Sequence, residues 1–222
     1  MLIRPILGLS RIALCVSLCV YAVAEQQAGT ATVGFTLDFP GANPGHYEII
    51  VGNDGTGTYK SNGQLDQQSD PAEQAPLEFT LSDNVRARIF ELSRQAKYFS
   101  GKLDSGRKDI ANTGVKTLTY KDGKHNTNAT YNYSPVTPVR EITSIFEGLS
   151  ITLEFGRRLA YFRKYEKLAL EEDLKRMEEL QRDKSLGDLQ AIAPLLNDIA
   201  NDKTVMNVAR ARALRLLAAA GK

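Results

Sequence analysis

The longest helical pattern in the chain extends from Thr137 to about Asp183, and it restricts the folds that the chain can adopt. Thr137 is typical of an N-cap and Pro138 of the first helical position. Apolar side chains then recur at helical spacing, and the glycines in this stretch are Gly148 and Gly156. A continuous helix of this length would measure about 65–70 Å at 1.5 Å per residue. We therefore expect a spine, whose first half packs on the preceding residues and whose second half packs on the following ones.

The residues before the spine predict a mostly antiparallel sheet. Apolar and polar side chains alternate with the period of two that is typical of a half-buried strand. A helix capped by Ser82 separates the fourth strand from the fifth, and the order shows no regular strand–helix–strand alternation. This predicts an α+β fold with helices on one face of the sheet. The predicted strands are Thr32–Phe39, His46–Val51, Thr56–Lys60, Leu77–Leu81, Val115–Lys121 and Thr130–Tyr133.

The residues after the spine predict a helical hairpin. Ser185 caps a first helical segment that Pro194 must kink or restart, and the polar pair at 201–202 separates it from a helix ending near Ala220. The apolar pattern from Ile192 to Leu217 resembles one HEAT-type helical repeat. Solenoids need three or more such repeats, so this resemblance implies a helical hairpin and no HEAT function.

The first 24 residues have the pattern of a signal peptide. A basic start precedes the apolar run Ile12–Val23, and Ala22-Val23-Ala24 forms a cleavage site before Glu25. The apolar run is shorter than the roughly 20 residues that a membrane span requires. We expect an exported protein, periplasmic or extracellular, with no membrane span after cleavage.

Both cysteines, Cys15 and Cys19, belong to this predicted signal peptide. Each follows a leucine rather than a small residue, which argues against lipoprotein processing. The mature chain would therefore depend on its hydrophobic core rather than on disulfides, which favours a bacterial periplasm or envelope. Its acidic and basic residues balance, so its charge supports neither a nucleic-acid partner nor an anionic membrane surface.

These patterns divide the chain into residues 1–24 as signal peptide, 25–150 as an α+β sheet domain, and 151–222 as a helical C-terminal region that shares the spine. The N-terminal pattern resembles uncharacterised secreted bacterial domains of unknown function. The resemblance implies no activity, and it depends on Tyr47–Val51, Asp54-Gly55, Tyr59, the helix after Ser82 and Leu118–Gly123.

No residue is predicted to be catalytic, to bind a cofactor or to ligate a metal. His46 starts a strand and His125 follows a hairpin turn, and no nucleophile motif such as G-x-S-x-G accompanies either histidine. A zinc site would require the fold to join both histidines to carboxylates. Asp54–Gly57 lacks the ligand spacing of an EF-hand and is typical of a hairpin turn. Asn128–Thr130 matches the three-residue glycosylation pattern, which is common by chance.

The charges of the spine and of the last helix predict solvated helix faces. Oppositely charged residues four positions apart stabilise a helix by a few tenths of a kcal/mol each. The last helix carries Arg210, Arg212 and Arg215 near its C-terminus, where cations suit the helix dipole. The predicted pairs of the spine are Glu154 with Arg158, Glu171 with Lys175, Glu172 with Arg176, and Glu178 with Arg182.

Three functions are compatible with these patterns. The first is a non-enzymatic exported module that binds another envelope or secreted protein through the sheet face, the polar loop Gly101–Gly114 or the spine. The second is a hydrolase whose carboxylates only the fold brings together, which a cleft with perturbed carboxyl groups would favour. The third is a structural envelope component that self-associates through the long helix.

Overall fold

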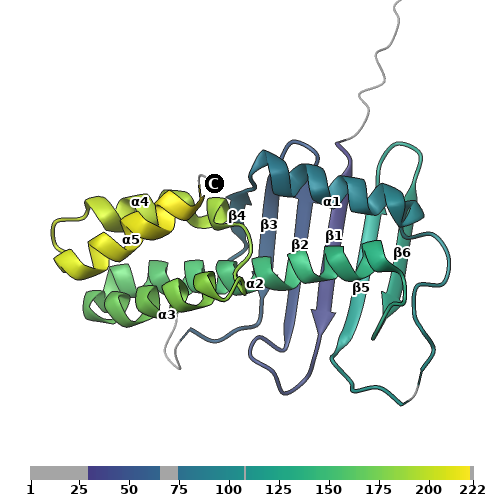
Figure 1. Ribbon diagram of the computed structural model, residues 1–222, viewed down its shortest axis with the longest axis horizontal. Helices are drawn as coiled ribbons and strands as arrows, with labels where there is room; N and C mark the ends of the chain where they lie inside the picture. Colours follow the sequence, from purple (N-terminus) through teal and green to yellow (C-terminus); the bar gives the residue numbers. More distant parts are fainter. Residues whose placement is uncertain (1–29, 66–74, 108, 221–222) are drawn as a thin grey trace, which may run out of the picture.

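A six-stranded antiparallel sheet forms one end of the protein in the computed structural model (Figure 1), which describes residues 30–65, 75–107 and 109–220. The strand order is β4-β3-β2-β1-β5-β6, and every neighbouring pair is antiparallel. This confirms the predicted α+β fold. The predicted signal peptide lies outside the described residues. The strands are β1 (Thr32–Asp38), β2 (His46–Gly52), β3 (Thr56–Ser61), β4 (Leu77–Thr80), β5 (Val115–Lys121) and β6 (Asn126–Tyr131).

The last strand is longer than its sequence pattern indicated. β6 begins at Asn126 rather than Thr130, because it pairs along the length of β5 from Lys121↔Asn126 to Lys116↔Tyr131. Residues 126–130 are mainly Asn and Thr, so they show little apolar alternation. Pairing with β5 therefore extends β6 to Asn126, although the sequence of residues 126–130 does not have a strand pattern.

Two helices cover one face of this sheet, and further helices form the other end of the molecule (Figure 1). α1 and the first half of α2 lie across the strands, where they bury side chains such as Phe35, Ile49 and Leu118. Phe35 stacks on Phe146 of α2 with ring centroids 5.3 Å apart. The helices are α1 (Asp83–Gln95), α2 (Thr137–Tyr165), α3 (Leu170–Arg182), α4 (Ala193–Asn201) and α5 (Asn207–Ala220), with short 3₁₀ turns η2 (Lys97–Phe99), η3 (Lys167–Ala169) and η4 (Leu189–Ile192).

The spine is two helices rather than one. α2 passes through both glycines without a break, ends at Tyr165, and is followed by Glu166 with a non-helical φ of −139° and ψ of 59°. α3 then turns back along α2, as shown by the 3.0 Å ion pair between Arg158 Nε and Asp173 Oδ2. The single helix to Asp183 is therefore wrong. Folding back buries the apolar side chains of α3, which a straight extension would leave in water.

The glycines of α2 are contact points for the C-terminal region. The Gly187 amide donates a 2.9 Å hydrogen bond to the Gly148 carbonyl, and a Cβ on Gly187 would lie 2.4 Å from the Leu149 nitrogen. At Gly156, an added Cβ would lie 2.7 Å from the Ile192 side chain. The two backbones therefore touch where the segment before η4 crosses α2. The predicted domain boundary at residue 150 lies inside α2, between these two contacts.

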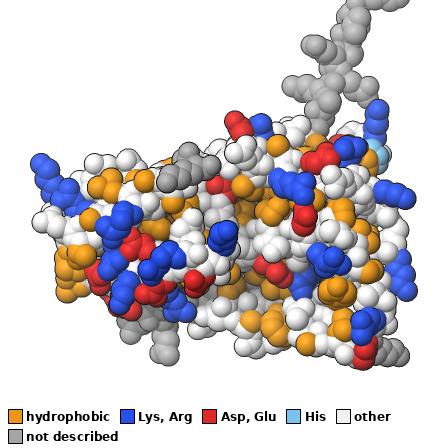
Figure 2. Space-filling model, in the orientation of Figure 1, with side chains coloured by type: hydrophobic (Ala, Val, Ile, Leu, Met, Phe, Trp, Pro, Cys, Tyr) orange, Lys and Arg blue, Asp and Glu red, His pale blue; other side chains and the backbone are white. Residues whose placement is uncertain are grey.

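Several ion pairs of the spine connect different helices. Glu171 and Glu178 of α3 both bind Arg212 of α5, and Glu178 also binds Arg215. Arg158 pairs with α3 rather than with Glu154. Arg158, Glu171 and Glu178 thus pair between helices rather than with the spine residues predicted for them, whereas Glu154 pairs with Arg157 within α2. The side chain of Arg212 is 19% exposed. Figure 2 shows acidic and basic side chains interleaved over this end of the molecule.

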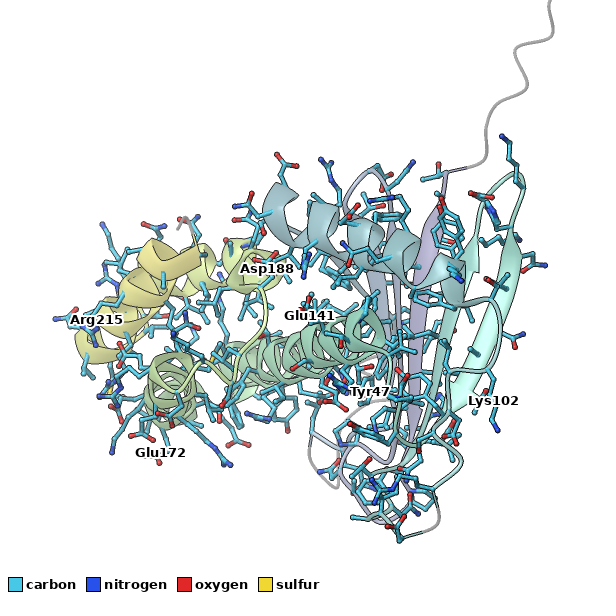
Figure 3. The ribbon with its side chains drawn as sticks, turned by 45° about the vertical axis from the view of Figure 1, so that its right-hand side comes forward. Tyr47, Lys102, Glu141, Glu172, Asp188 and Arg215 are labelled. Carbon is cyan, nitrogen blue, oxygen red and sulfur yellow. The ribbon has the colours of Figure 1, made fainter. Side chains whose placement is uncertain are left out.

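α2 connects the two ends, extending from the sheet toward α3 and α5 (Figure 3). Among the described residues, no helix covers the opposite face of the sheet, where threonine is frequent and Ile50 is 37% exposed. None of the helices in the described ranges has the length and hydropathy needed to cross a membrane.

Candidate functional site

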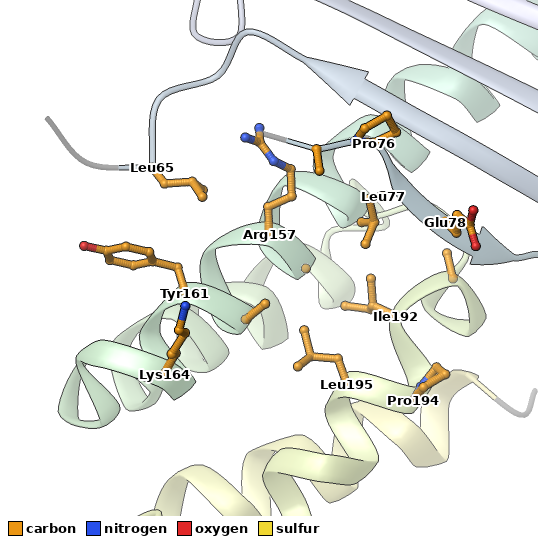
Figure 4. A pocket seen from close by; sticks show the side chains of 14 residues that line it. Leu65, Pro76, Leu77, Glu78, Arg157, Tyr161, Lys164, Ile192, Pro194 and Leu195 are labelled. Carbon is orange, nitrogen blue, oxygen red and sulfur yellow. The ribbon is translucent and has the colours of Figure 1, made fainter. Parts of the chain in front are cut away.

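A pocket of 450 Å³ lies between α2, β4 and α4 (Figure 4), and we call it the apolar pocket. One wall is the α2 surface around Ala160. Opposite lie Leu77 at the start of β4 and the side chains of Ile192 and Leu195 from η4 and α4. Leu65, after β3, contributes from the loop side. A concave site with this lining can hold an apolar group of a small ligand.

Local sequence explains why the pocket forms at this position. Gly156 lets Ile192 approach the α2 backbone, as the 2.7 Å clash of an added Cβ shows. One turn later, Ala160 leaves space that a larger side chain would fill. Pro194 lies in the first turn of α4. Backbone N–H groups in the first turn have no partner within the helix, so the missing N–H of proline costs no helical hydrogen bond there. The predicted restart of the helix at Pro194 is confirmed, since η4 ends at Ile192 and α4 follows.

A buried ion pair forms part of the pocket wall, since Arg157 is one of the lining residues. The Glu154 Oε1 atom accepts hydrogen bonds from the Tyr59 hydroxyl at 2.7 Å and from Arg157 Nη1 at 3.0 Å. The Ser61 hydroxyl donates to the same carboxylate oxygen and accepts from Arg157 Nη1 at 2.6 Å. Arg157 also donates to the carbonyl of Gly63. The carboxylate and guanidinium are therefore both partnered, which is the arrangement of a structural ion pair.

A second and more polar hollow, of 880 Å³, lies on the uncovered face of the sheet against η4 and α4, and we call it the sheet hollow. Threonines of β1, β3 and β4 line it, together with Gln190 of η4. Asp54 belongs to the β2–β3 hairpin turn, as predicted, and also lines the hollow. Its Oδ1 atom accepts from the Thr56 hydroxyl at 2.8 Å and from the Thr56 amide at 3.0 Å. These bonds hold the pKa of Asp54 below its ordinary value.

Each histidine binds an aspartate near a strand end. His46 Nδ1 lies 2.6 Å from Asp38 Oδ1, and His125 Nδ1 lies 3.1 Å from Asp122 Oδ2. Backbone amides of the β5–β6 turn, including that of His125, donate to Asp122 and keep the pKa of that carboxyl far below its ordinary value. Tyr98 stacks on the His125 ring with centroids 4.2 Å apart. Within the described ranges, no group of three or more His, Cys, Asp or Glu side chains is placed to hold a metal ion.

The polar loop Gly101–Gly114 is tied to the end of β6. The Asp104 carboxylate accepts from the Asn132 amide at 2.9 Å, and the Ser105 amide donates to the Tyr133 carbonyl. Next to this loop, Lys116 is buried and its ammonium donates to the Thr113 hydroxyl at 2.8 Å. Burial lowers the pKa of Lys116. The described part of this loop is therefore held by hydrogen bonds to the residues that follow β6.

Sequence reasoning named neither hollow. Both are built from segments far apart in the chain, so no local motif marks them. The weak signals were the small residues at 156 and 160 within a long helix, and the threonines at alternate positions of β3. These small residues and threonines indicate a site only once the fold places η4 and α4 opposite them.

Comparison with known proteins found no protein-family model that matches the chain and no curated protein that resembles it in sequence.

Burial of tyrosines in the sheet core predicts a loss of stability at alkaline pH. Burial raises the pKa of Tyr47 to about 12 and also raises the pKa of Tyr59 and Tyr131. The folded protein thus keeps these protons at pH values where the unfolded chain, with pKa values of about 10, has released them. The free energy of unfolding should be unaffected below about pH 10 and should fall between about pH 10 and 12.

Urea unfolding across this pH range measures the effect. The Tyr47→Phe variant should reduce the alkaline loss, with an upper bound of about 3 kcal/mol for a two-unit shift. Tyr165→Phe, at a half-exposed position, should leave it unchanged. An identical pH dependence in both variants would contradict the assignment to buried phenols.

Proposed function

We propose that this is an exported, non-enzymatic binding protein that holds the apolar part of a ligand in the apolar pocket. The observation that carries the proposal is the pocket itself, with a volume of 450 Å³ between α2, β4 and α4 and a mainly apolar lining, to which Glu78, Arg157 and Lys164 add charged side chains. Ligand sites in proteins are commonly clefts of about 300–1,000 Å³ with a mainly apolar lining. Export is proposed from the signal-peptide pattern of residues 1–24.

The expected affinity is moderate. Transfer of each methylene group from water contributes about 0.8 kcal/mol, so an eight-carbon chain gains about 6 kcal/mol before the costs of binding. Loss of translational and rotational freedom opposes this gain. An apolar chain alone should therefore bind weakly, and polar contacts outside the pocket are needed for a tight complex.

The chemistry of the described residues favours binding over hydrolysis. Glu78 is the one carboxylate among the described lining residues of the apolar pocket, whereas carboxylate-based hydrolysis uses a pair. The nearby Glu154 accepts from Tyr59, Ser61 and Arg157 within the buried ion pair. The hydrolase alternative thus gains no support from this site.

An uncharged fluorescent probe such as Nile red tests the proposal. The wild-type protein should enhance its fluorescence in a saturable manner. Ala160→Trp should weaken binding at least tenfold, because the exposed Ala160 side chain faces the pocket and a tryptophan there would fill it. Leu168→Trp is the matched control, since Leu168 is 77% exposed on η3. It should bind the probe as the wild-type protein does.

Two outcomes of the probe titration would contradict the proposal. If wild type, Ala160→Trp and Leu168→Trp bind the probe with the same affinity, the probe is not in the apolar pocket. If none of them binds it, the pocket does not take apolar ligands. Circular dichroism of each variant confirms that the fold is retained.

A further inference from the structure

The apolar pocket and the sheet hollow adjoin one another. Glu78, Ala191 and Pro194 line both. The apolar pocket lies on the helix side of β4, and the sheet hollow lies on the uncovered side of the sheet. A single ligand that passes over these three residues can therefore occupy both hollows.

Strand register gathers hydroxyl groups in the sheet hollow. Thr80 of β4 lies directly opposite Thr56 of β3, and Glu78 lies opposite Thr58. Directly opposed side chains of antiparallel strands have Cβ atoms about 5 Å apart, so these groups form one polar surface. Gln190 of η4 closes it from the side. Threonine hydroxyls both donate and accept hydrogen bonds, and the glutamine amide does the same.

The sheet hollow also has an apolar patch among these polar groups. Ile50 of β2 lies opposite Thr58 in the register and is 37% exposed. Pro194 contributes a further apolar surface from α4. An alternation of hydroxyl partners and C–H surface suits a sugar ring, which has hydroxyl groups at its edge and C–H groups on its faces.

Charge disfavours an anionic head group in the sheet hollow. Asp54 and Glu78 are carboxylates, and the described residues that line the sheet hollow include no Lys or Arg. An anion would be repelled without a compensating cation. A neutral head group matches the hollow better than a cationic one, because the lining threonines and Gln190 outnumber its two carboxylates, and Asp54 already accepts two hydrogen bonds from Thr56.

We propose that the ligand is a neutral amphiphile, with its apolar chain in the apolar pocket and a polyhydroxylated head group, such as a sugar, in the sheet hollow. This inference rests on the proposed function, because the apolar pocket must first accept the chain. It adds the chemical class of the ligand and assigns a second site to the uncovered face of the sheet.

Three probes with the same eight-carbon chain test the inference by calorimetric titration below their micelle concentrations. They are octyl β-glucoside, octanoate and octyltrimethylammonium. The glucoside should bind at least tenfold more tightly than the other two. Equal affinity for all three would overturn the assignment of the head group and leave the proposed function standing. Tighter binding of octyltrimethylammonium or of octanoate would overturn it in favour of a charged head group. Binding of none of them would overturn the proposed function as well.

Substitutions in the sheet hollow test whether the preference for the glucoside arises on the uncovered face of the sheet. Thr58→Val and Gln190→Ala should each reduce the preference for the glucoside over octanoate severalfold, while octanoate affinity stays unchanged. Thr36→Val is the matched control, because Thr36 lies on the same face in β1, outside the described lining of the sheet hollow. Unchanged preference in both hollow variants, with thermal midpoints equal to the wild type, would contradict the proposed position of the head group.

Discussion

Truncation of the chain after Asp183 is expected to abolish the folded monomer. Residues 184–222 contain η4, α4 and α5, which cover the apolar faces of α2 and α3. Each large apolar side chain contributes about 1.5–3 kcal/mol on burial, so six of them contribute roughly 9–18 kcal/mol. This equals or exceeds the whole stability of a typical domain, about 5–15 kcal/mol. The six buried side chains removed are Leu189, Ile192, Leu196, Ile199, Val205 and Leu216.

The truncation also uncovers side chains that remain. Leu174 and Met177 of α3 are fully buried in the complete protein, and α3 packs on α5. Exposure of this apolar face should cause aggregation or dimerisation. Size-exclusion chromatography with light scattering and a thermal melt measure both outcomes, with a chain cut after Ala220 as control. A truncated chain that is monomeric and as heat-stable as the control would show that residues 184–222 are a separate module.

The Arg157→Met variant is expected to lose about 3–5 kcal/mol of its free energy of unfolding. Methionine has similar length but no charge, so the Glu154 carboxylate would remain buried without its cation. The Glu154 side chain is 12% exposed, and the Arg157 side chain is 6% exposed, so water cannot replace the missing guanidinium. Urea unfolding of wild type and variant gives the difference directly.

Two comparison variants distinguish the cost of an unpaired buried carboxylate from the cost of removing any arginine. Arg163→Met, also in α2, removes the ion pairs with Asp198 and Asp202 at a side chain that is 35% exposed, and it should cost about 1 kcal/mol or less. Adding Glu154→Gln to Arg157→Met should restore part of the stability, because the buried charge is then removed. A double variant as unstable as Arg157→Met alone would show that packing of Arg157, rather than charge, determines the loss.

The sheet was predictable from sequence because one of its faces is covered and the other is not. Alternation along β1, with Val33 and Phe35 buried, follows directly from this asymmetry. The start of α2 at Thr137 was predictable for a local reason too, since Pro138 fits the first turn. Such features are encoded within a few neighbouring residues.

The break at Glu166 and the two hollows were not predictable in this way. No glycine or proline marks the end of α2, and the helical pattern continues into α3. The break is set by tertiary burial of Leu170 and Leu174, which needs α2 and α5 as partners. The hollows likewise need η4 to lie against β4, a contact that the sequence pattern does not specify.

The central place of β1 in the sheet determines the order in which the strands can assemble. β1 pairs on one side with β2, the next strand in the chain, and on the other with β5, about 80 residues later. The early hairpins can form quickly, because their loops are short. Closure of the long loop then pairs β5 with β1, and this step carries a larger entropy cost. Until it occurs, the free edge of β1 presents unpaired N–H and C=O groups, so the newly made chain is most prone to association with other strands before Lys121 has been added.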